Sequence, residues 1–219
     1  MSPGNLQAPE AEAARAFVEA IDAQDYAAAW ELLGPRSREV LGSQEALADS
    51  KEVWISWARS PDVLIFRSGL LTDIDEEHRH SLSVVTFTGT VTRQGATQQR
   101  TVAMPAWVEH DDGDPVRAWI EPFAEATPPL AIVDPVEAGT VACEDVRIAA
   151  DSPAKLGGTA VSLDGESRYP DLDTDDPGRV TFLLDAPPSA GEHVLTFAYV
   201  TYEGALYADA VRFTIEGSC

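Results

Sequence analysis

The chain has 219 residues, a length that suits two domains of about 100 residues each. With 37 acidic and 15 basic residues its formal net charge is −22, which disfavours duplex nucleic acid and anionic membrane surfaces as partners. Hydrophobic residues make up 44% of the chain, which excludes wholesale disorder, and no apolar run approaches the ~20 residues of a membrane helix.

The first predicted element is an amphipathic helix over residues 9–24. Ala13, Phe17, Ala20 and Ile21 recur there at three- and four-residue spacing. They form one apolar stripe, as expected for a helix that packs one face against a core.

Three further helical segments are expected before the first strand. Asp25 can cap a helix over residues 26–33, because its side chain can accept from free backbone N–H groups. A short turn of helix follows at residues 37–41. Ser43 then caps a helix that runs to about Ala58. The inner side of this last helix would carry Leu47, Val53, Trp54 and Trp57.

Antiparallel strands are predicted next, over residues 63–73, 79–93, 98–110 and 116–121. The run over 79–93 is the clearest, because its residues alternate in the period of two that a strand requires. Both faces of these strands carry apolar groups. One face should therefore meet the helices, while the other meets water, a ligand or a second domain.

The segment AARAFVEAIDAQDYAAAWELLGPRSREVL, followed by long strands, resembles the nuclear-transport-factor-two-like family of cystatin-like α+β cones. The resemblance covers about residues 11–123. It implies three helices packed on a curved antiparallel sheet around a conical cavity. Some members, such as ketosteroid isomerase and polyketide cyclases, are enzymes that use an Asp or His inside the cone. Others are accessory domains without chemistry, and no residue here matches an enzymatic motif of the family.

Aromatic residues of the first half are candidates for lining a pocket, where a small ligand would bind. They are Tyr26, Trp30, Trp54, Trp57, Trp107 and Trp119, and Arg117 joins them on the strand face of Trp119. Arg117 would meet an anionic ligand if that face lines the cone. The alternatives are plain core filling for the tryptophans and a surface position for Arg117.

The histidines of the first half offer a weaker site. His78 and His80 stand two residues apart, a spacing that places two metal ligands on one side of a strand. A simpler interpretation is that these histidines and the acidic segment before them form a solvated hairpin turn. His110 ends a strand beside Asp111 and is expected to be exposed.

Residues 137–219 are predicted to form a second, all-β domain, after an α+β domain over 1–125 and a proline-rich connector with the first strand over 126–136. Short apolar runs are separated by Gly, Pro and Asp, as in an immunoglobulin-like or fibronectin-like β-sandwich, which the segment resembles. One predicted strand places Val194, Thr196, Ala198 and Val200 in alternation. A register slip is expected in the last strand, between Ala210 and Val211.

The two cysteines, Cys143 and Cys219, are either separate thiols or one disulfide. In such a sandwich the first strand runs parallel to the last, and Cys143, which starts the second strand, would lie near the C-terminus. We therefore predict a Cys143–Cys219 bridge, which implies an oxidising compartment.

An acidic loop of the second half offers possible metal ligands. Asp171, Asp173 and Asp175 alternate there as calcium ligands do, although Asp176 and Phe182 stand where an EF-hand has glycine and glutamate. A solvated acidic loop is the alternative. No other cofactor is expected.

The sequence favours a non-catalytic binding or interaction protein of the bacterial cell envelope, with a protein partner or a small apolar ligand. An extracytoplasmic location would require an export segment that this chain lacks, and a cytoplasmic location is the alternative. The alternative function is a cone-pocket isomerase, dehydratase or cyclase. Such an enzyme would need a carboxylate or histidine held in the apolar pocket, whereas the acids lie mainly at turns and helix ends.

Overall fold

The structure is a computed structural model of a protein that is mostly β, with few helices. It describes residues 8–50, 54–57, 64–73, 79–93, 96–112, 114–123, 130–143, 146–152, 156–176, 178–184, 189–201 and 206–217. The chain divides into two compact units, Met1–Ala124 and Glu125–Cys219, and each contains its own apolar core.

Helices open the first unit. They are α1 (Pro9–Asp22), α2 (Tyr26–Glu31), α3 (Pro35–Leu41) and α4 (Gln44–Asp49). The predicted caps are confirmed: the Asp25 side chain accepts from the Ala28 N–H at 3.0 Å, and Ser43 Oγ accepts from the Ala46 N–H at 3.2 Å. The described residues of this unit thus contain four helices, whereas the family resemblance implies three.

A five-stranded antiparallel sheet follows. Its strands are β1 (Trp54–Trp57), β2 (Leu64–Asp73), β3 (Arg79–Arg93), β4 (Ala96–Asp111) and β5 (Asp114–Ile120). The order is β1-β3-β4-β5, and β2 pairs with β3 beside β1. β3 has the bounds predicted from its alternation, and the strand character of the other three predicted segments is confirmed.

The expected helix from Ser43 to about Ala58 is wrong in its second half. α4 ends at Asp49, and Trp54–Trp57 forms β1, whose Trp54 lies opposite Thr92 of β3. Tryptophan and isoleucine favour strands, and pairing with a long neighbouring strand supplies backbone hydrogen bonds that outweigh the helical spacing of this segment.

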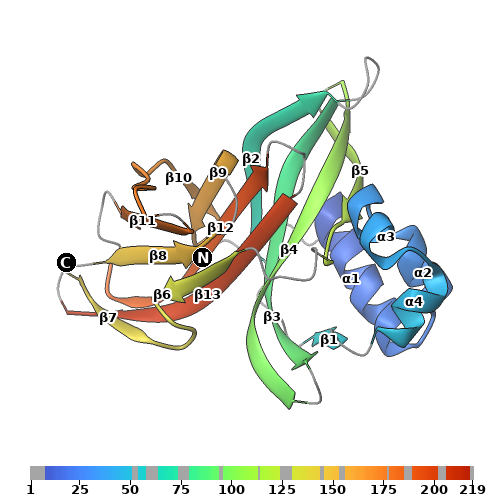
Figure 1. The fold of residues 1–219 in the computed structure, drawn as a ribbon, viewed down its shortest axis with the longest axis horizontal. Helices are drawn as coiled ribbons and strands as arrows, with labels where there is room; N and C mark the ends of the chain where they lie inside the picture. The colour runs from blue at the N-terminus through green and yellow to red at the C-terminus, as the bar shows by residue number, and fades with distance from the viewer. Residues whose placement is uncertain are drawn as a thin grey trace. The chain divides into compact units, whose positions relative to one another are not determined.

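The helices lie together on one face of the sheet (Figure 1), which we call the helix side. The predicted stripe of α1 is confirmed, because Ala13, Phe17, Ala20 and Ile21 are all buried there. Sheet residues that complete this core are Val85, Phe87, Val102, Met104, Ala106, Val108, Ala118 and Ile120. The described residues establish a helical layer on an antiparallel sheet, and the conical cavity stays a prediction.

The described part of the second unit consists of two sheets. The strands are β6 (Ala131–Asp134), β7 (Thr140–Ala142), β8 (Arg147–Asp151), β9 (Leu156–Leu163), β10 (Glu166–Arg168), β11 (Arg179–Leu183), β12 (Gly191–Thr201) and β13 (Leu206–Glu216). One sheet has the order β10-β9-β12-β13-β7 and the other β11-β8-β6.

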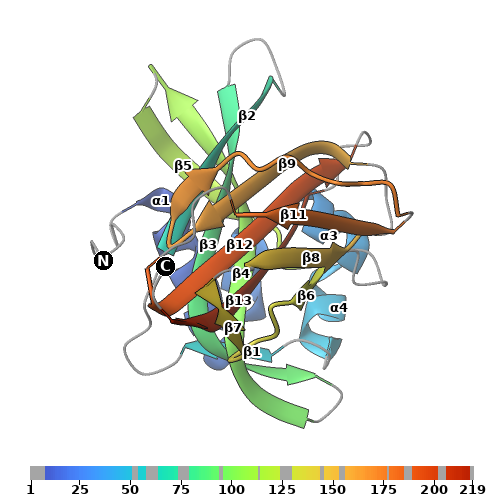
Figure 2. The same cartoon turned by 90° about the vertical axis from the view of Figure 1, so that its left-hand side faces the viewer.

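The two sheets of the second unit share one core, and Figure 2 shows β8 and β11 lying across β12. Ile148 and Phe182 come from the three-stranded sheet, and Leu195, Phe197 and Phe213 come from the five-stranded sheet. This arrangement is that of a β-sandwich.

One detail of the last strands differs from expectation. The predicted alternation of Val194, Thr196, Ala198 and Val200 lies in β12, whose residues in the shared core are those of the other set, Leu195, Phe197 and Tyr199. The slip expected between Ala210 and Val211 is absent, since residues 191–200 of β12 pair with residues 206–215 of β13 without a shift.

The parallel pairing with the last strand was predicted for the first strand, within residues 126–136, but the next strand makes it. Val141 of β7 lies opposite Ile215 of β13 in a parallel pair, whereas β6 pairs antiparallel with β8. Cys143 directly follows β7 and precedes β8, so it does not start a strand as expected. No helix among the described residues is long and apolar enough to cross a membrane.

Candidate functional site

Two predicted pocket residues, Tyr26 and Trp30, lie on α2, on the helix side. Both are half-buried against the core of that side. The Trp30 ring centroid lies 5.8 Å from the guanidinium carbon of Arg38, which is a cation–π contact.

Trp54 and Trp57 lie in β1, in register with Thr92 and Gly89 of β3. Their side chains are outside the part of the chain that the structure describes. Their expected place in a pocket therefore stays a prediction.

Trp107 and Trp119 lie opposite each other on β4 and β5. The neighbours of Trp107 along β4, Ala106 and Val108, are buried in the helix-side core. Because side chains alternate along a strand, the two tryptophans project from the other face of the sheet. Both are half-buried.

An arginine, a histidine and a glutamate border this tryptophan pair. The guanidinium carbon of Arg117 lies 4.6 Å from the Trp119 ring centroid. The centroids of the His80 and Trp119 rings lie 5.8 Å apart. Glu109 is in register with His80 on one side and with Arg117 on the other. We call these five residues the tryptophan–arginine face.

The predicted pocket residues thus divide between two faces of one sheet. Tyr26 and Trp30 lie on the helix side, whereas Trp107, Arg117 and Trp119 lie on the tryptophan–arginine face. The structure brings the last three together and separates them from the first two. Arg117 itself is exposed and stacked on an aromatic ring.

A correction concerns His80, which was expected in a solvated turn. It lies in β3 and is 6% exposed, since the strand begins at Arg79 and carries His80 against the Trp119 ring. His78 lies outside the described residues, so the proposed pair of metal ligands is not tested.

Sequence reasoning missed a polar cluster on the helix side. Glu10 of α1 is fully buried, and its Oε1 accepts a hydrogen bond of 3.2 Å from Ser83 Oγ. Two residues before Ser83, Ser81 Oγ lies 2.6 Å from Nε2 of His110. His110 was expected to be exposed, but it is half-buried because this hydrogen bond holds it against β3. In the sequence, Glu10 looks like an ordinary acid of a first helical turn.

Glu121 is a second buried acid, and it caps α3 from outside that helix. It accepts from the backbone N–H groups of Arg36 at 3.2 Å and Ser37 at 2.6 Å. The N-cap residue itself, Gly34, has no side chain that could cap. Burial raises the pKa of Glu121, and the hydrogen bonds from Ser37 and Arg36 offset only part of this effect. The Glu121 carboxylate therefore stabilises the first turn of α3.

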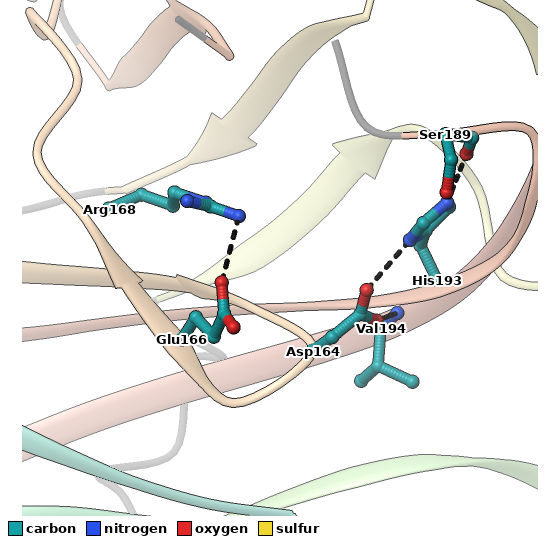
Figure 3. Close-up of polar contacts among 6 residues, drawn as sticks. All are labelled: Asp164, Glu166, Arg168, Ser189, His193 and Val194. Carbon is teal, nitrogen blue, oxygen red and sulfur yellow. Dashed lines mark hydrogen bonds and ion pairs between the residues drawn. The ribbon is translucent and has the colours of Figure 1, made fainter. Parts of the chain in front are cut away.

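In the second unit, His193 of β12 joins the turn after β9 (Figure 3). Its Nδ1 lies 2.7 Å from Oδ2 of Asp164, and its Nε2 lies 2.7 Å from the carbonyl oxygen of Ser189. Oδ1 of Asp164 accepts from the Val194 N–H at 2.9 Å. A doubly protonated imidazole donates both ring hydrogen bonds, whereas either neutral tautomer donates only one. The cluster fastens a turn to a strand and presents no open reactive atom.

Asp164→Ala is expected to lower the free energy of unfolding of the second unit by about 2–4 kcal/mol. The substitution removes the two carboxylate oxygens, one of which bonds His193 Nδ1 while the other accepts from the Val194 N–H. Asp164 also has φ of 55°, a conformation that alanine disfavours and asparagine tolerates. Asp164→Asn, the matched control, should cost about 1 kcal/mol or less, since its amide can bond a neutral ring. Urea unfolding followed by far-ultraviolet circular dichroism measures both. Equal costs for the two variants would contradict the assigned contacts.

The structure does not gather the predicted calcium ligands. Asp171, Asp173 and Asp175 are all exposed, and Asp173 Oδ1 accepts from the backbone N–H of Asp175 at 3.0 Å. Among the described residues, no three His, Cys, Asp or Glu side chains form a group that could hold a metal ion.

Cys143 is disulfide-bonded, and no described cysteine is free. Cys219 lies outside the described residues, so the Cys143–Cys219 pairing stays a prediction. A Cβ placed on Gly217 would lie 3.8 Å from the Cβ of Cys143, so the chain approaches Cys143 two residues before its end.

No protein-family model and no curated protein matches the chain. The resemblance of residues 11–123 to the nuclear-transport-factor-two-like family therefore gains no support from these comparisons and stays a prediction.

Some solved structures are distantly similar. CopC from Methylosinus trichosporium OB3b is 17% identical with a TM-score of 0.33, and the match covers 40% of this chain and 93% of CopC. PcoC, a methionine-rich copper resistance protein from Escherichia coli, is 18% identical with a TM-score of 0.34, over 42% of this chain and 100% of PcoC. SGBP-B of a Bacteroides ovatus mixed-linkage glucan utilization locus is 11% identical with a TM-score of 0.25, over 75% of this chain and 42% of that chain. Similarities this weak establish no shared ligand or activity.

Proposed function

We propose that the protein is a non-catalytic binding protein whose contact surface is the tryptophan–arginine face. The observation that carries this proposal is the convergence of Trp107, Trp119 and Arg117 from two paired strands onto one side of the sheet. Tryptophan and arginine are the residue types most enriched at the centres of protein-binding surfaces. They lie on rigid strands, which reduces the ordering cost of binding.

Several buried ionisable groups support binding over chemistry. Glu121 is committed to the first turn of α3, and His193 and Asp164 are committed to each other and to backbone groups. Each of these groups already has the partners that a buried polar group requires.

We propose that the first unit is a nuclear-transport-factor-two-like cone and that the second is an immunoglobulin-like spacer. The disulfide of Cys143 supports an extracytoplasmic location in the cell envelope, because disulfides persist in oxidising compartments.

A nuclear magnetic resonance screen of the whole protein tests the proposed surface. The probes are a fragment library of amines, guanidines, carboxylates, sugars and small aromatics, and the readout is the indole N–H signals, assigned by single Trp→Phe variants. We expect hits to move the Trp107 and Trp119 signals. Trp30, which also lies near an arginine but on the helix side, provides the matched control signal. Hits that move only Trp30 or other signals would refute the surface.

A second candidate function rests on the helix-side polar cluster. The buried Glu10, held by Ser83, and the Ser81–His110 pair offer a carboxylate and a histidine of the kind that acid–base catalysis uses. This would suit an isomerase, dehydratase or cyclase acting on an apolar molecule. In the same screen, apolar fragments that move the His110 ring signals and leave Trp107 unchanged would favour the enzyme.

A further inference from the structure

The two tryptophans of the tryptophan–arginine face differ in what surrounds them. Trp119 already has a cation, Arg117, at 4.6 Å and the His80 ring at 5.8 Å. No cation or aromatic ring is recorded against Trp107 among the described residues, although it lies directly opposite Trp119. Within the described ranges, the face therefore contains one tryptophan with a cation and a neighbouring tryptophan that has none.

The residues that follow Trp107 along the chain are mostly acidic. Glu109 and Asp111 follow Trp107 at two-residue steps along β4, so they project from the same face. Asp112 and Asp114 come from the adjoining turn and the start of β5. Glu109 is half-buried and the three aspartates are exposed. Between residues 107 and 120 the sequence has these four acids, one arginine and no lysine.

We propose that Trp107 binds an arginine or lysine side chain of an extended partner segment, and that the carboxylates of Asp111, Asp112 and Asp114 attract the positive charge of that side chain. This partner class would bind at the tryptophan–arginine face, so it rests on the function proposed for that face. A cation above an indole ring is attracted by the negative face of the ring, and Arg117 over Trp119 is an instance of this contact on the same face.

Charge complementarity selects this partner over others. The chain has a net charge of −22, and the stretch through Thr127 carries 21 acidic and 10 basic residues. An acidic segment would be repelled by Asp111, Asp112 and Asp114. A neutral segment would gain the aromatic contact but no attraction to these three carboxylates. A basic segment gains both the contact with the Trp107 ring and the attraction to the carboxylates. The negative electrostatic potential of the protein also speeds its approach.

Titration of the whole protein with three capped pentapeptides tests the inference. The peptides are glycine chains with a central arginine, glutamine or glutamate, and the readout is the indole N–H signal of Trp107. We expect the arginine peptide to bind about three- to five-fold more tightly than the glutamine peptide, with the glutamate peptide weakest. Trp107→Leu should reduce arginine-peptide binding, read from the Trp119 signal, to the glutamine level.

Two charge variants separate a local effect from net charge. Asp111→Asn, Asp112→Asn and Asp114→Asn together should weaken arginine-peptide binding about two- to five-fold. Asp171→Asn, Asp173→Asn and Asp175→Asn together change the net charge equally but lie in the second unit, and they should leave binding unchanged. These charge variants also test the inference if Trp107→Leu fails to fold.

Equal binding of the arginine and glutamine peptides would overturn the inference, as would equal weakening by the two charge variants. In either case a fragment of another class that moves the Trp107 signal would preserve the binding surface and reject only its cationic partner. Absence of any effect at Trp107 from peptides and fragments alike would reject both.

Discussion

Gly34→Ala is expected to lower the free energy of unfolding of the first unit by about 2–4 kcal/mol. A Cβ at this position would lie 2.0 Å from Oε1 of Glu121 and 2.5 Å from its Cδ. Glu121 is 4% exposed and bonded to two backbone N–H groups, so its carboxylate can move only by losing them. The backbone of Gly34 is extended, with φ of −72° and ψ of 168°, so alanine causes no backbone strain.

Urea unfolding followed by tryptophan fluorescence measures this change, because all five tryptophans belong to the first unit. Glu121→Ala provides the control: it is costly alone, but it removes the atoms that a Cβ at residue 34 would strike. Adding Gly34→Ala to Glu121→Ala should therefore cost less than about 1 kcal/mol. If Gly34→Ala costs as much in the Glu121→Ala background as it does alone, the contact between residue 34 and Glu121 does not cause the destabilisation.

Reduction of the disulfide is expected to destabilise the second unit by about 4 kcal/mol. The predicted Cys143–Cys219 bridge closes a long loop, and the chain-entropy account gives this magnitude for a loop of that length. Circular dichroism of the second unit with and without reductant measures the shift, while tryptophan fluorescence of the first unit should stay unchanged. Cys143→Ser should be insensitive to reductant.

Peptide mapping under non-reducing conditions checks the pairing itself. We expect one linked peptide that contains both Cys143 and Cys219. A linkage between two protein molecules, or an unlinked Cys219, would contradict the predicted bridge.

Elements with a strong local signal were predictable from the sequence. The alternation over residues 79–93 gave the bounds of β3, and the caps Asp25 and Ser43 gave the starts of α2 and α4. These features depend on residues within one turn or one strand. Local propensity and hydrogen-bonding chemistry therefore decide them.

Elements that depend on distant pairing were not predictable. Trp54 and Trp57 stand three residues apart, which fits a helix, yet β1 forms because β3 lies beside it. In β12 both alternating sets are apolar, and only the size of Leu195, Phe197 and Tyr199 suggests which set fills the core. Tertiary contacts override local preference in both cases.

The candidate site was predictable in its residues but not in its arrangement. The sequence singled out Trp107, Arg117 and Trp119, but their convergence depends on the register between β4 and β5. The burial of Glu10 could not be foreseen, since its partner Ser83 is 73 residues away. No local pattern marks such a contact.

We expect ligands to bind this protein at the tryptophan–arginine face and not on the helix side. A crystal structure with the tightest-binding fragment of the screen tests this expectation most directly. The fragment should lie against the Trp107 ring. A fragment bound beside Glu10, Ser83 and His110 would contradict the proposed surface and favour an enzyme.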